Sequence, residues 1–223
     1  MTRTALILSY SFPPANDPSG QRAYYLGKYL PRMGWAVKVL TPARADACHG
    51  LSSIAWPETS AEILRAGLSL ARFRSVKTVA MGHAAGFRHA DVRIARCFYR
   101  LSQMVLIPDK GVVWLPPALR TGVRLLRSGD ISAVVTTSPR FTCHVAGMAL
   151  RRAFGVPWIA DFQDFHYLCC SAGKNRGFRR WADKKLEGAV VRLADHVTFV
   201  SAAMRRRYCE AYPEHAPKFS VVY

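Results

Sequence analysis

The sequence predicts an α/β fold: a Rossmann-like parallel sheet with helices on both faces. The chain has 223 residues, a length that suits one large domain with a single core. Half of the residues are apolar and 11% are aromatic, which excludes a disordered chain. Short apolar runs alternate with segments of helical periodicity, as in consecutive βαβ units. We therefore expect residues 1–223 to form one domain.

Six apolar runs are the predicted strands. Most are continuous rather than alternating, as in parallel strands that are covered on both faces. They are Ala5–Ser9, Ala36–Thr41, Ala133–Thr137, Trp158–Asp161, His196–Val200 and Phe219–Tyr223. The first run leads into a proline pair without a small-residue cleavage site, so we interpret it as a strand and not as a secretory leader.

The segments between these predicted strands have apolar residues at helical spacing. Ala23, Leu26, Leu30 and Met33 recur at helical spacing, and Gly34 is placed to end that helix. Further helices are expected from Ser138 to Gly155, from about Phe178 to Leu193, and after a cap at Ser201. The region from 43 to 107 is less regular: we expect helices at Glu58–Phe73 and Ala90–Val105 and a strand at Val76–Met81.

Net charge is the strongest signal in the composition. The chain has 32 Lys and Arg against 14 Asp and Glu, a net charge of +18. This excess favours an anionic partner, such as nucleic acid, the anionic leaflet of a membrane or a phosphorylated substrate. A genome rich in arginine codons is an alternative origin. Nucleic acid is not expected, because no RRM, KH or helix-turn-helix signature is found.

One predicted helix concentrates these charges. On the helix from Phe178 to Leu193, Arg180 and Lys184 share a face away from most of the apolar stripe, and Lys185 follows them. We expect these three residues to face an anionic membrane. The alternative is an ordinary solvated helix face. Apolar runs elsewhere are too short or too interrupted by proline to span a bilayer.

The six cysteines show no zinc-like spacing, which fits reduced thiols in a cytoplasmic protein. The seven histidines form neither an HExxH nor a His-x-His pair. No metal and no cofactor are therefore expected.

A loop rich in turn-forming residues follows the first strand, from Ser11 to Arg22. A nicotinamide-binding or flavin-binding domain would carry GxGxxG here, and that fingerprint is missing. The loop opens at the carboxyl end of a strand, where open α/β sheets bind ligands. Gly20 leads backbone N–H groups into a helix start suited to phosphate or sugar oxygens. A loop without function is the alternative.

The stretch from Tyr10 to Gly34, followed by Val37–Pro42, resembles the opening of family 4 glycosyltransferases. Three further segments are similar to that family. Ile107–Trp114 is similar to its Pro-Asp segment with a following Trp, Thr137–His144 to its strand-to-helix turn ending in His, and Pro157–Asp164 to its Asp-x-Arg-Asp segment. Ser19 stands where the family usually has the first of two glycines, and Gln163 where it usually has arginine.

The resemblance implies the N-terminal, acceptor-binding half of a metal-independent enzyme with the two-domain GT-B fold. Such an enzyme transfers a sugar from a nucleotide-sugar to a glycan, a lipid-linked or another cell-envelope acceptor, in the cytoplasm or at the inner face of the cell membrane. The family binds the donor mainly in a second Rossmann domain, and this chain ends at Tyr223. We therefore expect the C-terminal donor-binding domain to be missing and the chain to be inactive alone.

Sugar transfer needs a group that accepts a hydroxyl proton and a set of contacts that hold the substrates. His144 and Asp164 are the candidate catalytic residues, because both follow central strands and should meet in one cleft. A satisfied core or surface histidine and a helix-capping aspartate are the alternatives. The candidate substrate-binding residues are Asn16, Asp17, Ser19, Gly20, Arg22, Asp109, Trp114, Ser138, Asp161 and Gln163.

A non-catalytic reading also remains open. A basic α/β module could dock on an anionic membrane or on nucleic acid without transferring any sugar.

Overall fold

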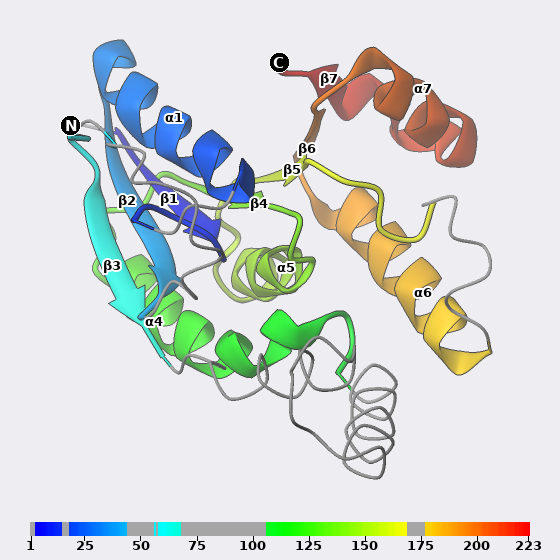
Figure 1. Ribbon diagram of the computed structural model, residues 1–223, viewed down its shortest axis with the longest axis horizontal. Helices are drawn as coiled ribbons and strands as arrows, with labels where there is room; N and C mark the ends of the chain where they lie inside the picture. Colours follow the sequence, from blue (N-terminus) through cyan, green and yellow to red (C-terminus); the bar gives the residue numbers. More distant parts are fainter. Residues whose placement is uncertain (1–2, 15–17, 44–55, 57, 68–105, 169–176) are drawn as a thin grey trace, which may run out of the picture.

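The computed structural model describes residues 3–14, 18–43, 56, 58–67, 106–168 and 177–223. Within them, a parallel sheet has the strand order β3-β2-β1-β4-β5-β6-β7 (Figure 1). The strands are β1 (Arg3–Ser9), β2 (Trp35–Pro42), β3 (Glu62–Ala66), β4 (Ala133–Thr137), β5 (Trp158–Phe162), β6 (His196–Phe199) and β7 (Phe219–Val221).

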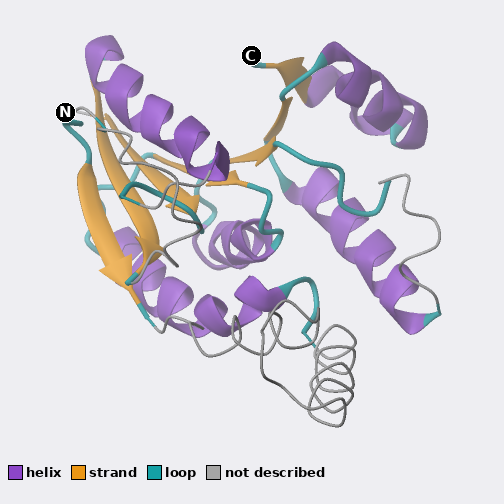
Figure 2. Cartoon of the chain, in the orientation of Figure 1, coloured by secondary structure: helices purple, strands orange, loops and turns teal. Residues whose placement is uncertain are grey.

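Helices cover both faces of the sheet (Figure 2). They are α1 (Gln21–Tyr29), α4 (Leu115–Arg127), α5 (Thr142–Phe154), α6 (Phe178–Leu193) and α7 (Ala202–Ala211). Short 3₁₀ helices are η1 (Pro18–Gly20), η2 (Leu30–Met33), η3 (Lys110–Trp114) and η4 (Pro213–Lys218). The buried residues of α1 join one apolar cluster, and those of α4, α5, α6 and α7 join a second, larger cluster. The predicted fold class is confirmed.

Neighbouring residues of β1 illustrate how the two clusters arise. Leu6 and Leu8 belong to the larger cluster, whereas Ile7 between them belongs to the smaller one. Successive side chains of a strand point to opposite faces, so a continuous apolar run serves both clusters. On the larger side, α5 lies against the sheet at Gly147, where a Cβ atom would come within 2.5 Å of Thr136 and Trp158 side chains.

The predicted strands agree with the structure to within two residues at each end. The predicted helix from Phe178 to Leu193 is α6 with the same bounds. Gly34, with φ of 80°, ends η2 in the left-handed conformation, and the Ser201 hydroxyl caps α7 by accepting a hydrogen bond from the Met204 N–H. The helix expected from Ser138 begins only at Thr142.

One expectation between β2 and β4 is wrong, and one helix in this region was not predicted. Residues Glu62–Ala66, expected within a helix, form β3 because β2 offers a free edge for pairing, and Lys38 binds Glu62 across it at 2.9 Å. Tertiary pairing here overrides the local helix preference. Helix α4 was not among the predicted helices, and its two prolines lie in its first turn, where proline is tolerated. The remaining predictions for residues 68–105 lie outside the described residues.

The described helices include none long and apolar enough to cross a membrane. Cys143 and Cys209 are free thiols, and burial raises the pKa of the Cys143 thiol far above its ordinary value. The other four cysteines lie outside the described residues.

Candidate functional site

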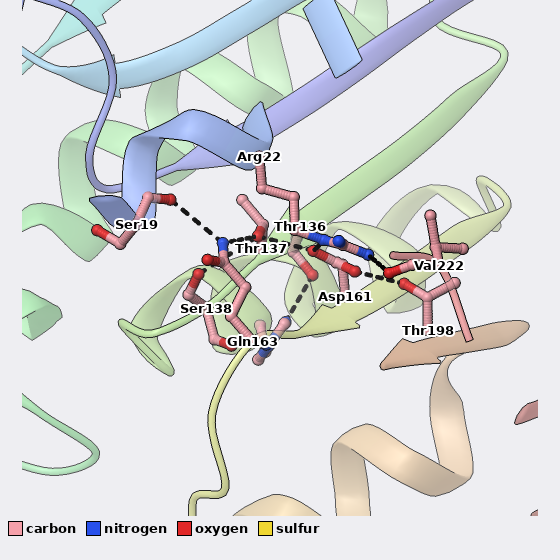
Figure 3. Close-up of polar contacts among 10 residues, drawn as sticks. Ser19, Arg22, Thr136, Thr137, Ser138, Asp161, Gln163, Thr198 and Val222 are labelled. Atoms are coloured by element: carbon pink, nitrogen blue, oxygen red, sulfur yellow. Dashed lines mark hydrogen bonds and ion pairs between the residues drawn. The ribbon is translucent and has the colours of Figure 1, made fainter. Parts of the chain in front are cut away.

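Polar side chains gather near the carboxyl ends of β4, β5 and β6, on the α1 face of the sheet (Figure 3). Thr137, Asp161 and Thr198 are register partners across these strands. Asp161 is 2% exposed, and its carboxylate accepts hydrogen bonds from the hydroxyls of Thr137 at 2.9 Å and Thr198 at 2.6 Å. A charge this buried needs further compensation.

Arg22, in the first turn of α1, supplies that compensation. Its Nε lies 2.7 Å from the Asp161 carboxylate, and its Nη2 donates to the Val222 carbonyl oxygen at 2.8 Å. The Arg22 side chain is 16% exposed. One guanidinium thus joins the start of α1 to β5 and to the segment after β7.

Gln163 connects the same aspartate to the loop before α1. Its backbone N–H donates to the Ser138 hydroxyl at 2.7 Å, and its side-chain amide donates to Thr137 Oγ1 at 2.6 Å and to the Ser19 carbonyl at 3.2 Å (Figure 3). The amide is used for internal contacts, at the position where the resembled family carries a guanidinium. Residues from the loops that follow β1, β4 and β5 therefore belong to one hydrogen-bond network.

The loop can approach this closely because residue 20 is glycine. A Cβ atom on Gly20 would lie 3.1 Å from the carbonyl carbon and oxygen of Ser11. Gly20 immediately precedes α1, and the first backbone N–H groups of that helix start beside the network.

Asp164 lies just beyond β5 and differs from Asp161 in its exposure and in its contacts. Its side chain is exposed. No hydrogen bond or ion pair joins its carboxylate to another residue of the described part of the chain. Asp164 is therefore open to a ligand, whereas Asp161 is occupied.

Asp109 and Trp114 hold a neighbouring segment in place. The Asp109 carboxylate caps η3 through the Gly111 N–H at 2.6 Å, and it accepts from the Thr142 N–H at 3.0 Å and hydroxyl at 2.9 Å. The Trp114 side chain is 1% exposed, and its Nε1 donates to the Ala66 carbonyl at 2.9 Å. Both predicted substrate-binding residues thus have structural partners.

His144 is fully buried, so its expected position facing an open cleft is wrong. Its ring stacks on Phe162 with centroids 4.7 Å apart and meets the edge of Phe141. Its Nδ1 lies 2.8 Å from Thr136 Oγ1, while its Nε2 has no hydrogen-bond partner among the described residues. Burial lowers the pKa of the imidazole to about 3, so the ring is neutral at physiological pH. The cause is that α5 turns this side chain towards the sheet and not towards the loops.

A second buried carboxylate lies on the opposite face of the sheet. Glu187 of α6 is fully buried and accepts hydrogen bonds from the Tyr167 N–H at 2.7 Å and from the hydroxyls of Tyr208 at 3.0 Å and Tyr212 at 3.1 Å. Burial raises the pKa of Glu187 above its ordinary value. This cluster ties α6 to α7 and to the loop after β5.

Of the predicted site residues, the structure brings one group together at a single edge: Ser19, Gly20, Arg22, Ser138, Asp161 and Gln163. Asn16 and Asp17 lie outside the described residues. Sequence reasoning missed Thr137 and Thr198. A polar residue near the carboxyl end of a mostly apolar strand was the available signal for both. In the described residues no three His, Cys, Asp or Glu side chains group as a metal site would require.

Residues 19–222 match the model of a family described as the glycosyl transferase 4-like domain. A comparison with curated proteins finds no match.

Proposed function

The chain belongs to the glycosyl transferase 4-like family, and from this premise we propose that it is the acceptor-binding domain of a glycosyltransferase. The enzyme would transfer a sugar from a nucleotide-sugar to a lipid-linked or other cell-envelope acceptor. The observation that carries the proposal is the edge where Asp164 is exposed beside the Arg22–Asp161–Gln163 network. Ligands of open α/β sheets bind at this edge.

Asp164 is the proposed catalytic residue. An exposed carboxylate can accept a hydrogen bond from the acceptor hydroxyl and take its proton as that oxygen bonds to the sugar. The bond from the sugar to the nucleoside diphosphate breaks in the same reaction, and the diphosphate leaves with the electron pair. Asp161 cannot serve in this way, because its two oxygens are engaged by Thr137, Thr198 and Arg22. We assign Asp161 a positioning role.

The start of α1 is the proposed contact for phosphate or sugar oxygens. Gly20 and Ser19 place the first turn of the helix beside the network, and helix N-termini favour anionic oxygen. The guanidinium of Arg22, whose side chain is 16% exposed, is held at the same place by Asp161.

His144 was predicted to be a catalytic residue, and we now propose a structural role for it. A neutral, buried ring that stacks on Phe162 supports the end of β5 from the opposite face of the sheet. We therefore propose that His144 positions the Gln163–Asp164 segment and does not transfer the proton itself.

Titration calorimetry with a panel of nucleotide-sugars tests the proposal. Transfer requires donor and acceptor in near-attack geometry, and these residues supply the acceptor side. We expect no saturation of the 223-residue chain at millimolar donor, that is, less than about 4 kcal/mol of binding. Micromolar donor binding, or sugar transfer by the chain itself, would show that the donor site is complete within it.

Titration calorimetry with inorganic anions tests the non-catalytic alternative. Saturable binding of these anions, without any dependence on a sugar or a nucleotide, would favour a basic binding module.

For the enzyme we propose a cytoplasmic location with peripheral contact to the inner face of the membrane. The net charge of +18 supports an anionic surface as the partner.

A further inference from the structure

We propose that the first two turns of α6 dock on an anionic lipid bilayer, with Phe178 and Trp181 inserted at the headgroup level and Arg180, Lys184 and Lys185 bound to lipid phosphates. These five residues are called the α6 patch. The proposal deepens the proposed function, because it places the acceptor edge at the membrane where a lipid-linked acceptor resides.

The aromatic pair is the first observation. Phe178 is 69% exposed and Trp181 is 56% exposed. Their rings stack on each other with centroids 5.6 Å apart and an interplanar angle of 27°. Single exposed apolar residues are ordinary on protein surfaces, whereas two adjacent large aromatic side chains form a small apolar patch. Trp is a preferred side chain at the membrane–water interface.

The charge around the pair is the second observation. The acidic residues of α6, Asp183 and Glu187, are both buried and directed into the protein. The exposed charged side chains of α6 are therefore all basic: Arg180, Lys184, Lys185 and Arg192. A helix with a basic exposed face and large apolar side chains beside it binds anionic membrane surfaces.

The α6 patch adjoins the acceptor edge of the sheet. Arg179, between the two aromatic residues, donates to the carbonyl oxygens of Leu106 and Pro108, next to Asp109. Arg180 and Lys184 lie over the ring of Tyr167, 5.2 and 5.8 Å from its centroid. Tyr167 is three residues beyond Asp164 in the loop after β5. A bilayer seated on the patch would thus meet the loop that carries Asp164.

A second exposed aromatic surface lies on α1 and η2, and it serves as the control. Tyr25 is 46% exposed and Tyr29 is 45% exposed, with Met33 beyond them. The two tyrosine rings stack with centroids 6.0 Å apart, and Lys28 and Arg32 lie over the Tyr29 ring, so this surface resembles the α6 patch in composition and differs in its place in the fold. This surface belongs to the helix on the opposite face of the sheet, and it runs from the middle of α1 away from Gly20.

The test is co-sedimentation of the full chain with vesicles of phosphatidylcholine alone or with added phosphatidylglycerol. We expect binding to the anionic vesicles only. R180A/K184A/K185A should weaken it about a hundredfold, and F178S/W181S at least about tenfold. At high salt the unaltered chain should keep residual binding that the aromatic variant loses. Y25S/Y29S should bind as the unaltered chain does.

Tryptophan fluorescence reports insertion separately from attachment. Trp114 and Trp158 are buried, Trp35 and Trp56 are half-buried, and Trp181 is exposed. The part of a blue shift on adding anionic vesicles that comes from Trp181 should therefore be missing in W181F. Thermal unfolding of each variant checks that the substitutions leave the fold intact.

Three results would overturn the proposal. They are loss of binding in the α1 variant but not in the α6 variants, equal binding by F178S/W181S and the unaltered chain at all salt concentrations, and no binding of the unaltered chain to anionic vesicles. No vesicle result depends on a sugar donor, so failure here leaves the calorimetric test of the proposed function untouched. Conversely, unexpected donor binding would not alter the vesicle assay.

Discussion

Two buried carboxylates on opposite faces of the sheet have been stabilised in different ways. Asp161 is 2% exposed and Glu187 is fully buried. Asp161 has a guanidinium partner 2.7 Å away, whereas Glu187 accepts hydrogen bonds from one backbone N–H and two tyrosine hydroxyls. The pKa of Glu187 is raised, with burial as the largest cause. The comparison teaches that carboxyl groups of similar burial can be held by a cation or by neutral hydrogen-bond donors alone.

The largest effect is expected from Asp161→Ala. Its removal leaves Arg22 without its ion-pair partner and two threonine hydroxyls without their acceptor. We expect the free energy of unfolding to fall by about 3 kcal/mol, measured by urea denaturation. In a double-mutant cycle with Arg22→Ala, the two losses should be less than additive. Strictly additive losses would mean that the pair does not couple.

Gly20→Ala tests whether the loop before α1 must lie this close to β1. The added Cβ would lie 3.1 Å from the Ser11 carbonyl and displace the turn that carries Arg22. We expect a loss of about 1–3 kcal/mol in urea unfolding. Gly188→Ala is the matched control, because its Cβ would have no neighbour closer than 3.8 Å and alanine favours a helix. Equal losses for both variants would contradict the close approach.

Glu187→Gln tests how the buried carboxyl group of Glu187 makes the stability of the chain depend on pH. The folded-state pKa of Glu187 is raised above its ordinary value of 4.5, so its contribution to stability is complete below pH 4.5. That contribution is lost as the pH rises through the folded-state pKa. We therefore expect the unaltered chain to lose stability relative to Glu187→Gln as the pH rises from 4.5. Urea unfolding over a pH series measures this difference.

The control for this pH dependence is Glu210→Gln, since Glu210 is exposed on α7. Its stability should follow that of the unaltered chain at every pH. A stability difference for Glu187→Gln that stays constant with pH would contradict a shifted carboxyl group.

Asp164→Asn should have the smallest effect on stability. The side chain is exposed, and we expect a change within about 0.5 kcal/mol in the same urea assay. The contrast with Asp161, three residues earlier, separates a structural carboxylate from one available to a substrate. A loss comparable to that of Asp161→Ala would show that Asp164 is a structural partner as well.

The spacing of apolar residues predicted the secondary structure wherever it is regular over several helical turns or along a whole strand. Helix α6 and strand β4 have the expected bounds. Strand β3 was missed because its sequence, Glu62–Ala66, has no strand periodicity and depends on pairing with β2. Helix α4 was not predicted, and its prolines lie in the first turn, where they are compatible with a helix.

For the site, the sequence by itself determined which loops carry polar residues, because a parallel sheet brings the ends of its strands to one edge. Only the tertiary structure decided what each residue does there. Arg22 and Asp161 are 139 positions apart in the chain, and nothing local relates them. Asp161 and Asp164 share one short segment, yet the pleat turns one into the α1 face while the other lies past the strand end. His144 was misplaced for the same reason: which way a side chain at a helix start points is settled by the packing of that helix on the sheet.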